Sequence, residues 1–197
     1  MSSIFQSICV YCGSADKLNP EYLEAARSMG VAIARAGIRL VYGAGKTGLM
    51  GAVADGALQA GGVVIGVTPE NLNTPQLIHA RLSSLEVVAD IHARKARMTQ
   101  LADAFISLPG GLGTFDELFE TLTWLQIGIH RKPVGLLDTR HYFGPLLNMI
   151  DKACDEGFIY PEHRQLLIHD PSPTGLLERL NQFQLPDNLD RWVSRSE

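Results

Sequence analysis

The chain alternates short apolar runs with longer stretches of helical periodicity, and this alternation limits its fold more than any other feature. The apolar runs are rich in β-branched residues, as buried strands are, and lie at residues 7–11, 38–42, 63–67, 86–89, 104–108 and 133–137. Helical patterns follow them at residues 20–36, 49–60, 91–102, 114 to about 127, 143–156 and 174–181. Such alternation favours a mainly parallel sheet covered by helices on both faces. We therefore predict an α/β fold, with a single doubly wound domain over residues 1–197.

Composition agrees with one domain and indicates no nucleic-acid or membrane partner. A length of 197 residues suits a single domain. The formal net charge of −4 does not indicate the basic surface that binding of nucleic acid requires. No apolar run reaches the roughly 18 residues that a membrane helix needs. The first residues lack the basic and apolar regions of a signal peptide. We expect a cytoplasmic protein.

Cysteines and histidines do not predict a metal site. Cys9 and Cys12 have CxxC spacing, but both fall in or beside the first predicted strand. Residues three apart on a strand face opposite sides, so this pair cannot easily share a metal ion or a disulfide. The histidines form no ligand set that is close in sequence. We expect no bound metal.

A glycine-rich turn joins the predicted strand at 104–108 to the next helix. Glycines allow a ligand to approach the backbone closely, and a helix N-terminus offers unpaired N–H groups and a positive dipole end. Together these features favour an anion such as phosphate. Glu117 and Glu120 lie one helical turn apart beside this site. The turn therefore indicates chemistry on a phosphorylated small molecule, held by Gly110, Gly111, Gly113 and Thr114.

Both carboxylates also have structural interpretations. Thr114 and Glu117 fit a capping box, in which Thr114 is the N-cap residue and Glu117 reaches back to its backbone N–H. Glu120 is either a second carboxylate of the site or a partner for Arg97 or Lys132.

Arg94 lies near the start of the predicted helix at 91–102. It shares one helix face with Met98 and Leu101, which is an unusual place for an arginine if that face is core. The planar guanidinium binds phosphate or carboxylate through two hydrogen bonds, so Arg94 is a candidate to hold a substrate or orient a catalytic acid. A solvated basic turn is the alternative. Lys95 and Arg97 point elsewhere on the helix.

The segment Gly43–Gly48 matches GxGxxG after the second predicted strand, and Glu70 follows about twenty residues later. This is the outline of a dinucleotide fingerprint, although that fingerprint normally follows the first strand. Two interpretations stay open: a part in a nucleotide site, which includes Gly43 and Gly45, or a glycine-rich turn packed closely against a neighbouring loop.

Two motifs together resemble those of a known family. Residues 109–117 match PGGxGTxxE, and residues 94–98 match RKxxM. The chain closely resembles the LONELY GUY family of cytokinin-activating phosphoribohydrolases, and the likeness continues through residues 8–14, 42–51, 123–137 and 151–158. Many members of that family carry the label "lysine decarboxylase", yet nothing in this sequence suggests a pyridoxal site.

The resemblance implies a Rossmann-like homodimer that cleaves the N-glycosidic bond of purine nucleoside 5′-monophosphates, with no metal or redox cofactor. It implies Arg94 and Glu117 as the catalytic pair. The same resemblance makes the four residues of the glycine-rich turn the phosphate cradle. Weaker candidates for the substrate pocket are Gly13, Ser14, Lys95, Met98 and Thr123.

A non-catalytic nucleotide or cofactor carrier is the second interpretation, because a fold alone does not fix function. The presence of both Arg94 and Glu117 favours the enzyme, since a carrier would not require that pair. A dinucleotide oxidoreductase is a distant third. Two departures from the family pattern, Ala44 and Gln76, leave the choice of purine base open.

Overall fold

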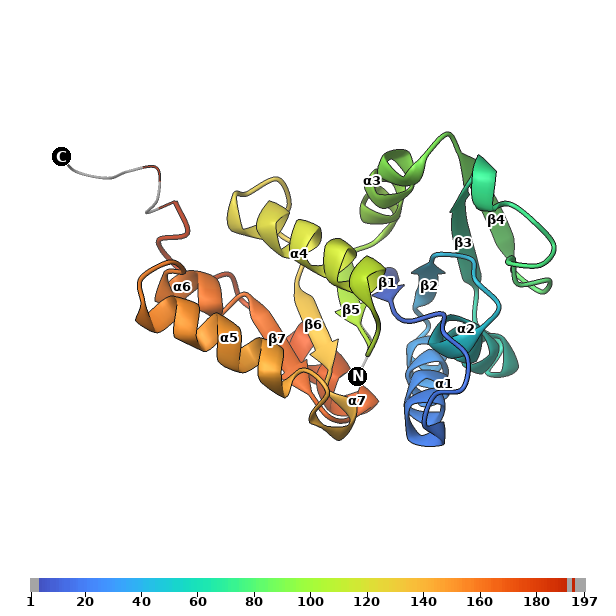
Figure 1. Ribbon diagram of the computed structural model, residues 1–197, viewed down its shortest axis with the longest axis horizontal. Helices are drawn as coiled ribbons and strands as arrows, with labels where there is room; N and C mark the ends of the chain where they lie inside the picture. Colours follow the sequence, from blue (N-terminus) through green and yellow to red (C-terminus); the bar gives the residue numbers. More distant parts are fainter. Residues whose placement is uncertain (1–3, 191–192, 194–197) are drawn as a thin grey trace.

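Seven parallel strands form one sheet in the order β4-β3-β2-β1-β5-β6-β7 in the computed structural model, which describes residues 4–190 and residue 193 (Figure 1). The strands are β1 (Ser7–Tyr11), β2 (Arg39–Tyr42), β3 (Val64–Pro69), β4 (Ser84–Val88), β5 (Ala104–Ser107), β6 (Val134–Leu137) and β7 (Leu167–Asp170). The predicted α/β fold with a parallel sheet is confirmed, and every pairing among the described strands is parallel.

Helices cover both faces of this sheet (Figure 1). They are α1 (Pro20–Arg35), α2 (Gly48–Gln59), α3 (Ile91–Leu101), α4 (Leu112–Gln126), α5 (Gly144–Asp155), α6 (Pro161–Arg164) and α7 (Pro173–Asn181), with short 3₁₀ turns η1 (Glu70–Leu72) and η2 (Thr139–His141). No helix among the described residues is both long and apolar enough to cross a membrane.

Alternate residues of the central strands enter two separate cores. Ile8 and Val10 of β1 join the core under α1, α2 and α7, whereas Cys9 and Tyr11 join the core under α3, α4 and α5. A strand buried on both faces reads as a continuous apolar run, which is why β1 was recognisable from its sequence. Cys12 lies in the core opposite Cys9, as the strand geometry predicted, and both thiols are free.

Two short elements were not predicted. β7 ends in the polar pair His169-Asp170, and α6 is only four residues long, so neither has the periodicity that identified the other elements. All of the helices and strands that were predicted occur within about two residues of their expected bounds. Of the predicted domain over residues 1–197, residues 1–3, 191–192 and 194–197 lie outside the described part.

The strand order places a crevice beside β1. The chain proceeds outward from β1 through β2 and β3 to β4 and then returns to add β5 on the other side of β1. At such a switch point the loops after neighbouring strands diverge, and ligands of doubly wound folds bind between them. The N–H of Gly13, after β1, donates to the carbonyl of Pro109, after β5, over 3.1 Å. The predicted glycine-rich turn therefore lies at the switch point.

Candidate active site

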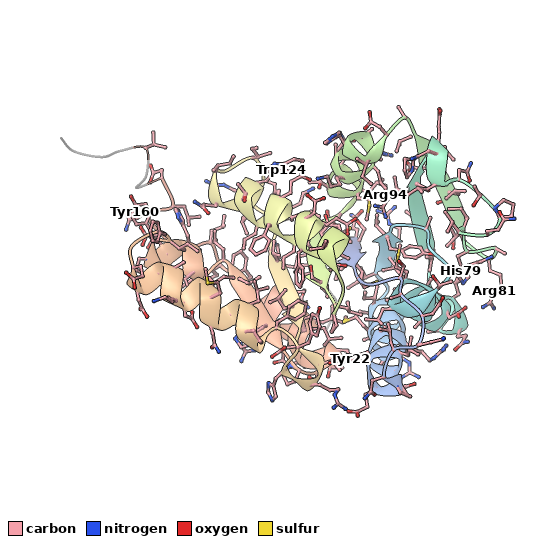
Figure 2. All side chains as sticks on the ribbon, viewed as in Figure 1. Tyr22, His79, Arg81, Arg94, Trp124 and Tyr160 are labelled. Carbon is pink, nitrogen blue, oxygen red and sulfur yellow. The ribbon has the colours of Figure 1, made fainter. Side chains whose placement is uncertain are left out.

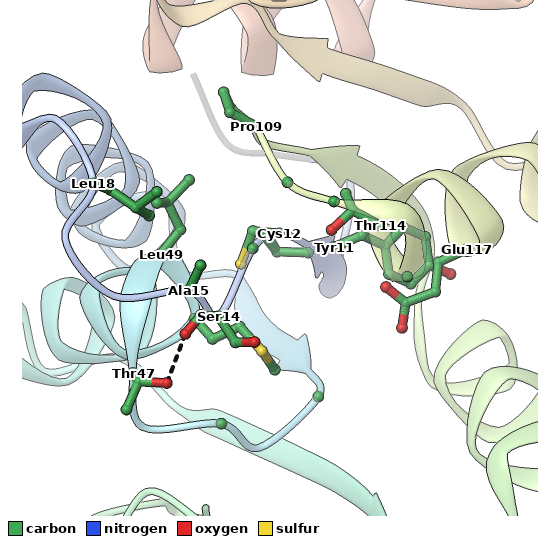
Figure 3. A pocket seen from close by; sticks show the side chains of 18 of the residues that line it. Tyr11, Cys12, Ser14, Ala15, Leu18, Thr47, Leu49, Pro109, Thr114 and Glu117 are labelled. Atoms are coloured by element: carbon green, nitrogen blue, oxygen red, sulfur yellow. Dashed lines mark hydrogen bonds between the residues drawn. The ribbon is translucent and has the colours of Figure 1, made fainter.

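A cavity of about 700 Å³ opens at the carboxyl ends of the central strands. Its walls come from the loops after β1, β2 and β5 and from the N-terminal parts of α2, α3 and α4. Figure 3 shows Thr114 and Glu117 of α4 on one side of this cavity and Ser14 and Thr47 on the other. A volume of this size is within the range of small-molecule sites.

Arg94 and Glu117 form an ion pair at one wall of the cavity. Nη1 of Arg94 lies 3.1 Å from Oε1 of Glu117, and each side chain is 12% exposed. Nε of the same guanidinium donates to the carbonyl of Val67, at 3.0 Å, so two different guanidinium nitrogens are bound. Figure 2 labels Arg94 between α3 and the strands of the sheet. The family resemblance implied that these two residues act as a pair, and the fold brings them into contact although they lie 23 residues apart in the sequence.

Burial raises the pKa of Glu117 to about 7, and the negative charge of Asp116 acts in the same direction. The positive charges of Arg94 and Lys95 oppose that rise without cancelling it. A carboxyl group whose pKa lies near neutrality can exchange protons at physiological pH, as acid–base catalysis requires. Buried titratable groups with such shifts in a cleft are typical of functional sites.

The predicted capping box is wrong. α4 begins at Leu112 with Gly111 as its N-cap residue, so Thr114 is already the third helical residue and no side chain caps the first turn. Thr114 is buried, and its Oγ1 lies against Gly110, where a Cβ would come within 2.1 Å of it. Glu117 is therefore not held at the helix end and turns to Arg94 instead.

The two helix N-termini that face the cavity differ in availability. The N–H groups of Leu49 and Met50, the second and third residues of α2, both donate to the carbonyl of Gly13. Thr47 donates to the carbonyl of Ser14 over 2.8 Å, as the dashed line in Figure 3 marks. The segment Gly43–Gly48 thus packs against the loop after β1, and because Gly43 and Gly45 also line the cavity, its part in a nucleotide site stays a prediction. At the N-terminus of α4, the N–H groups of Gly111 and Leu112 have no hydrogen-bond acceptor among the described residues, so this end is the better anion site.

Ten of the predicted site residues line the cavity: Gly13, Ser14, Gly43, Gly45, Arg94, Gly110, Gly111, Gly113, Thr114 and Glu117. The other four, Lys95, Met98, Glu120 and Thr123, are not among its lining residues, and their part in substrate binding stays a prediction. Met98 is fully buried in the core, and Thr123 is exposed farther along α4.

Lys95 links α3 to α4 by pairing with two carboxylates. Its Nζ lies 3.0 Å from both Asp116 and Glu120, and its side chain is 9% exposed. Burial alone would lower the pKa of Lys95, but the two hydrogen-bonded carboxylates raise it. The partner of Glu120 is therefore Lys95, and neither Arg97 nor Lys132 fills that role. Arg97 pairs with Glu86, and Lys132 donates to the carbonyl of Thr99.

Sequence reasoning missed an apolar wall and two tyrosines. The wall includes Leu72, Leu77 and Ile78 from the segment between β3 and β4, which we expected only as a loop over one face. Backbone hydrogen bonds tie this segment to the loop after β2: Lys46 N–H to Leu77, and His79 N–H to Ala44. The tyrosines are Tyr22 and Tyr142, which line the cavity together with Tyr11 of β1.

Neither feature had a distinctive sequence signal, because no periodic pattern marks the segment and the tyrosines belong to no motif. Cys12 also lines the cavity. Burial raises the pKa of its thiol, which therefore stays protonated and is not a nucleophile.

Comparisons with known proteins give a consistent relationship. The model of a family described as "Possible lysine decarboxylase" matches residues 50–180. Cytokinin riboside 5′-monophosphate phosphoribohydrolase LOG7 of Arabidopsis thaliana is 46% identical, over 92% of this chain and 84% of its own. The probable cytokinin riboside 5′-monophosphate phosphoribohydrolase LOGL3 of Oryza sativa subsp. japonica is 44% identical, over 92% of this chain and 86% of its own.

Solved structures share the fold at lower identity. The molybdenum cofactor carrier protein of Chlamydomonas reinhardtii is 24% identical with a TM-score of 0.68, over 89% of this chain and 96% of its own. The molybdenum cofactor binding protein of Rippkaea orientalis is 23% identical with a TM-score of 0.69, over 91% of this chain and 98% of its own. These two likenesses support the Rossmann-like architecture of the sheet and helices.

Proposed function

The chain belongs to the LONELY GUY family of cytokinin riboside 5′-monophosphate phosphoribohydrolases, and we propose from this that it hydrolyses the N-glycosidic bond of a purine nucleoside 5′-monophosphate. The products are the free base and ribose 5-phosphate. The observation that carries the proposal is the buried Arg94–Glu117 pair beside the open N-terminus of α4. A carrier protein needs the anion site at the N-terminus of α4 but does not need the Arg94–Glu117 pair.

Breaking an N-ribosidic bond builds positive oxocarbenium character on the sugar, as in glycoside hydrolysis. A carboxylate near the anomeric carbon stabilises that charge or activates the attacking water. Glu117 has this role in our proposal and acts in its ionised form. Arg94 orients the carboxylate and lowers its pKa relative to burial alone.

The substrate phosphate binds at the start of α4 in this proposal. Gly110, Gly111 and Gly113 leave the backbone accessible there, and the helix dipole favours the negative charge. The apolar wall of Leu72, Leu77 and Ile78 then faces the base. Such a surface suits the flat face of adenine and also an N6-prenyl group, so AMP and its prenylated relatives are both candidate substrates.

We also propose a homodimer. Large apolar side chains are exposed along and just after α4: Phe119 is 43% exposed, Ile127 42% and Ile129 62%. Exposed apolar residues gathered on one element are typical of a protein–protein interface. Light scattering coupled to size-exclusion chromatography measures the mass and would contradict the proposal if it found only the 21.5 kDa monomer. The cytoplasmic location expected from the sequence stays a prediction.

Lysine decarboxylation does not suit this cavity. A pyridoxal enzyme needs a lysine amine that reaches the cofactor, and no lysine is among the described residues that line the cavity. Lys95 is the nearest in sequence to Arg94, and its amine is held between Asp116 and Glu120.

A chromatographic assay tests the proposal. The protein is incubated separately with AMP, isopentenyladenosine monophosphate, GMP, CMP, NAD and unphosphorylated adenosine, with Glu117→Gln as the control. We expect release of a purine base from one or more 5′-monophosphates, none from adenosine or NAD, and none with the variant. Binding of a nucleotide without any release of base would instead favour the carrier.

A further inference from the structure

Two neighbouring carbonyls of the glycine-rich turn are held from outside the turn. The carbonyl of Pro109 accepts a hydrogen bond from the N–H of Gly13, at 3.1 Å. The carbonyl of Gly110 accepts one from the hydroxyl of Tyr142, at 2.5 Å. Tyr142 comes from the loop after β6 and lines the cavity as well. The turn is thus fixed between the β1 loop and the β6 loop.

Holding these carbonyls fixes the direction of two donors. A trans peptide unit is planar, so its N–H points away from its own C=O. The peptide whose oxygen binds Gly13 carries the N–H of Gly110, and the peptide whose oxygen binds Tyr142 carries the N–H of Gly111. Neither N–H has a hydrogen-bond acceptor among the described residues. Gly111 is also the N-cap residue of α4, so its N–H lies at the start of that helix, and both glycines line the cavity.

The backbone is strained just before Tyr142. Arg140 and His141 have φ of 57° and 55°, in the left-handed region that residues with a Cβ rarely adopt. Such a conformation costs on the order of 1 kcal/mol or more per residue and persists only where surrounding contacts hold it. Two contacts do so: Arg140 pairs with Glu21 of α1, and buried Asp138 accepts the N–H of Phe143 over 2.8 Å.

Aromatic packing completes the placement of Tyr142. Its ring meets Tyr22 edge to face, with centroids 6.1 Å apart, and meets Phe143 in the same way at 5.1 Å. The ring is therefore held on two sides while its hydroxyl reaches the turn. Strained backbone of this kind is typical of functional sites, and the element that it positions here is the Tyr142 side chain.

We propose that Tyr142 is a positioning residue for the phosphate of the substrate: its hydroxyl holds the Gly110–Gly111 peptide so that the N–H groups at the start of α4 face the anion. The identity of the anion as a nucleotide 5′-phosphate rests on the proposed function. The donors themselves serve any phosphate monoester of suitable size.

The test is Tyr142→Phe, which removes the hydroxyl and keeps the ring. Calorimetry measures binding of ribose 5-phosphate and of adenosine, and steady-state kinetics measure KM and kcat for the best nucleotide. We expect roughly threefold to tenfold weaker binding of ribose 5-phosphate, the loss that one neutral hydrogen bond gives. KM rises by the same factor, whereas kcat and adenosine binding change by less than about twofold.

Tyr42→Phe is the matched control, because the Tyr42 hydroxyl donates to the carbonyl of Gly45 in another loop, at 3.2 Å. That variant should leave the ratio of ribose 5-phosphate affinity to adenosine affinity unchanged. Unaltered ribose 5-phosphate affinity in Tyr142→Phe would overturn the proposal, and so would an equal loss for both ligands. Binding of ribose 5-phosphate by a wild-type protein that hydrolyses no nucleotide would count against the proposed function while leaving this test intact.

Discussion

The backbone of Gly43 lies directly against the guanidinium of Arg94, so that a Cβ at position 43 would come within 1.7 Å of Nη2. The loop after β2 therefore contributes to the site because the missing side chain at position 43 leaves space for the guanidinium of Arg94. Because the guanidinium binds both Val67 and Glu117, any side chain at position 43 displaces a group with two fixed partners. The close approach of Arg94 requires a glycine at position 43.

Gly43→Ala should lower kcat/KM by tenfold or more without unfolding the protein, since the displaced Arg94 no longer orients Glu117. Misplacement of a catalytic group by about 1 Å can cost two orders of magnitude in rate. The control is Gly144→Ala at the start of α5, where no atom lies within 4 Å of an added Cβ. Equal kinetics for Gly43→Ala and wild type would contradict the role given to Arg94.

Glu117→Gln should abolish detectable release of base, because the amide can neither carry the negative charge nor accept a proton. General acid–base groups typically contribute a factor of about 10² to 10⁴ in rate. Binding of ribose 5-phosphate should persist, since the α4 N-terminus is unchanged. Retained turnover in this variant would remove Glu117 from the mechanism.

The same substitution should stabilise the fold at alkaline pH. The pKa of Glu117 is raised from 4.5 to about 7, so the folded protein holds the proton more tightly than the unfolded chain. Stability supplied by the protonated group is present below pH 4.5 and is lost as pH rises to about 7. The loss is at most about 3 kcal/mol. Urea unfolding should therefore show that Glu117→Gln gains stability over wild type at pH 8 but not at pH 4.

The glycine-rich turn was predicted from the residues and the Arg94–Glu117 pair from the family resemblance, but the contacts that hold them could not be derived from the sequence pattern. Glycines after a buried strand, followed by a helix, mark an anion site through local chain geometry alone. The partner of Glu117 is separated from it by the whole of β5, and only the β1–β5 switch brings the two together. The partner of Glu120 shows the same limit: the sequence suggested Arg97 or Lys132, and the packing of α3 against α4 places Lys95 there instead. The position of Tyr142 depends on the left-handed conformations of Arg140 and His141, which no sequence pattern predicts.

Asp116→Asn should move the acidic limb of the kcat/KM profile to lower pH. If Glu117 must be ionised, wild-type kcat/KM falls about tenfold per pH unit below pH 7, where the carboxylate becomes protonated. The charge of Asp116 raises the pKa of Glu117, so its removal lowers that pKa. The substrate phosphate also titrates near pH 6, but a substitution in the protein does not shift it. An unmoved limb would show that another group controls the profile.

Lys95→Met should shift the same limb in the opposite direction. The ammonium of Lys95 lowers the pKa of Glu117, so its loss leaves the buried carboxyl harder to ionise and the limb moves to higher pH. The substitution keeps the length and apolar stem of the side chain in its buried position between α3 and α4. It also leaves Glu120 without its cation, so thermal stability should fall modestly.

Kinetics from pH 5.5 to 9 with one nucleotide substrate separate the shift of the limb from the loss of stability, because a purely structural loss lowers kcat/KM equally at every pH. Opposite shifts in Lys95→Met and Asp116→Asn would identify Glu117 as the titrating group, and a common shift would contradict that assignment.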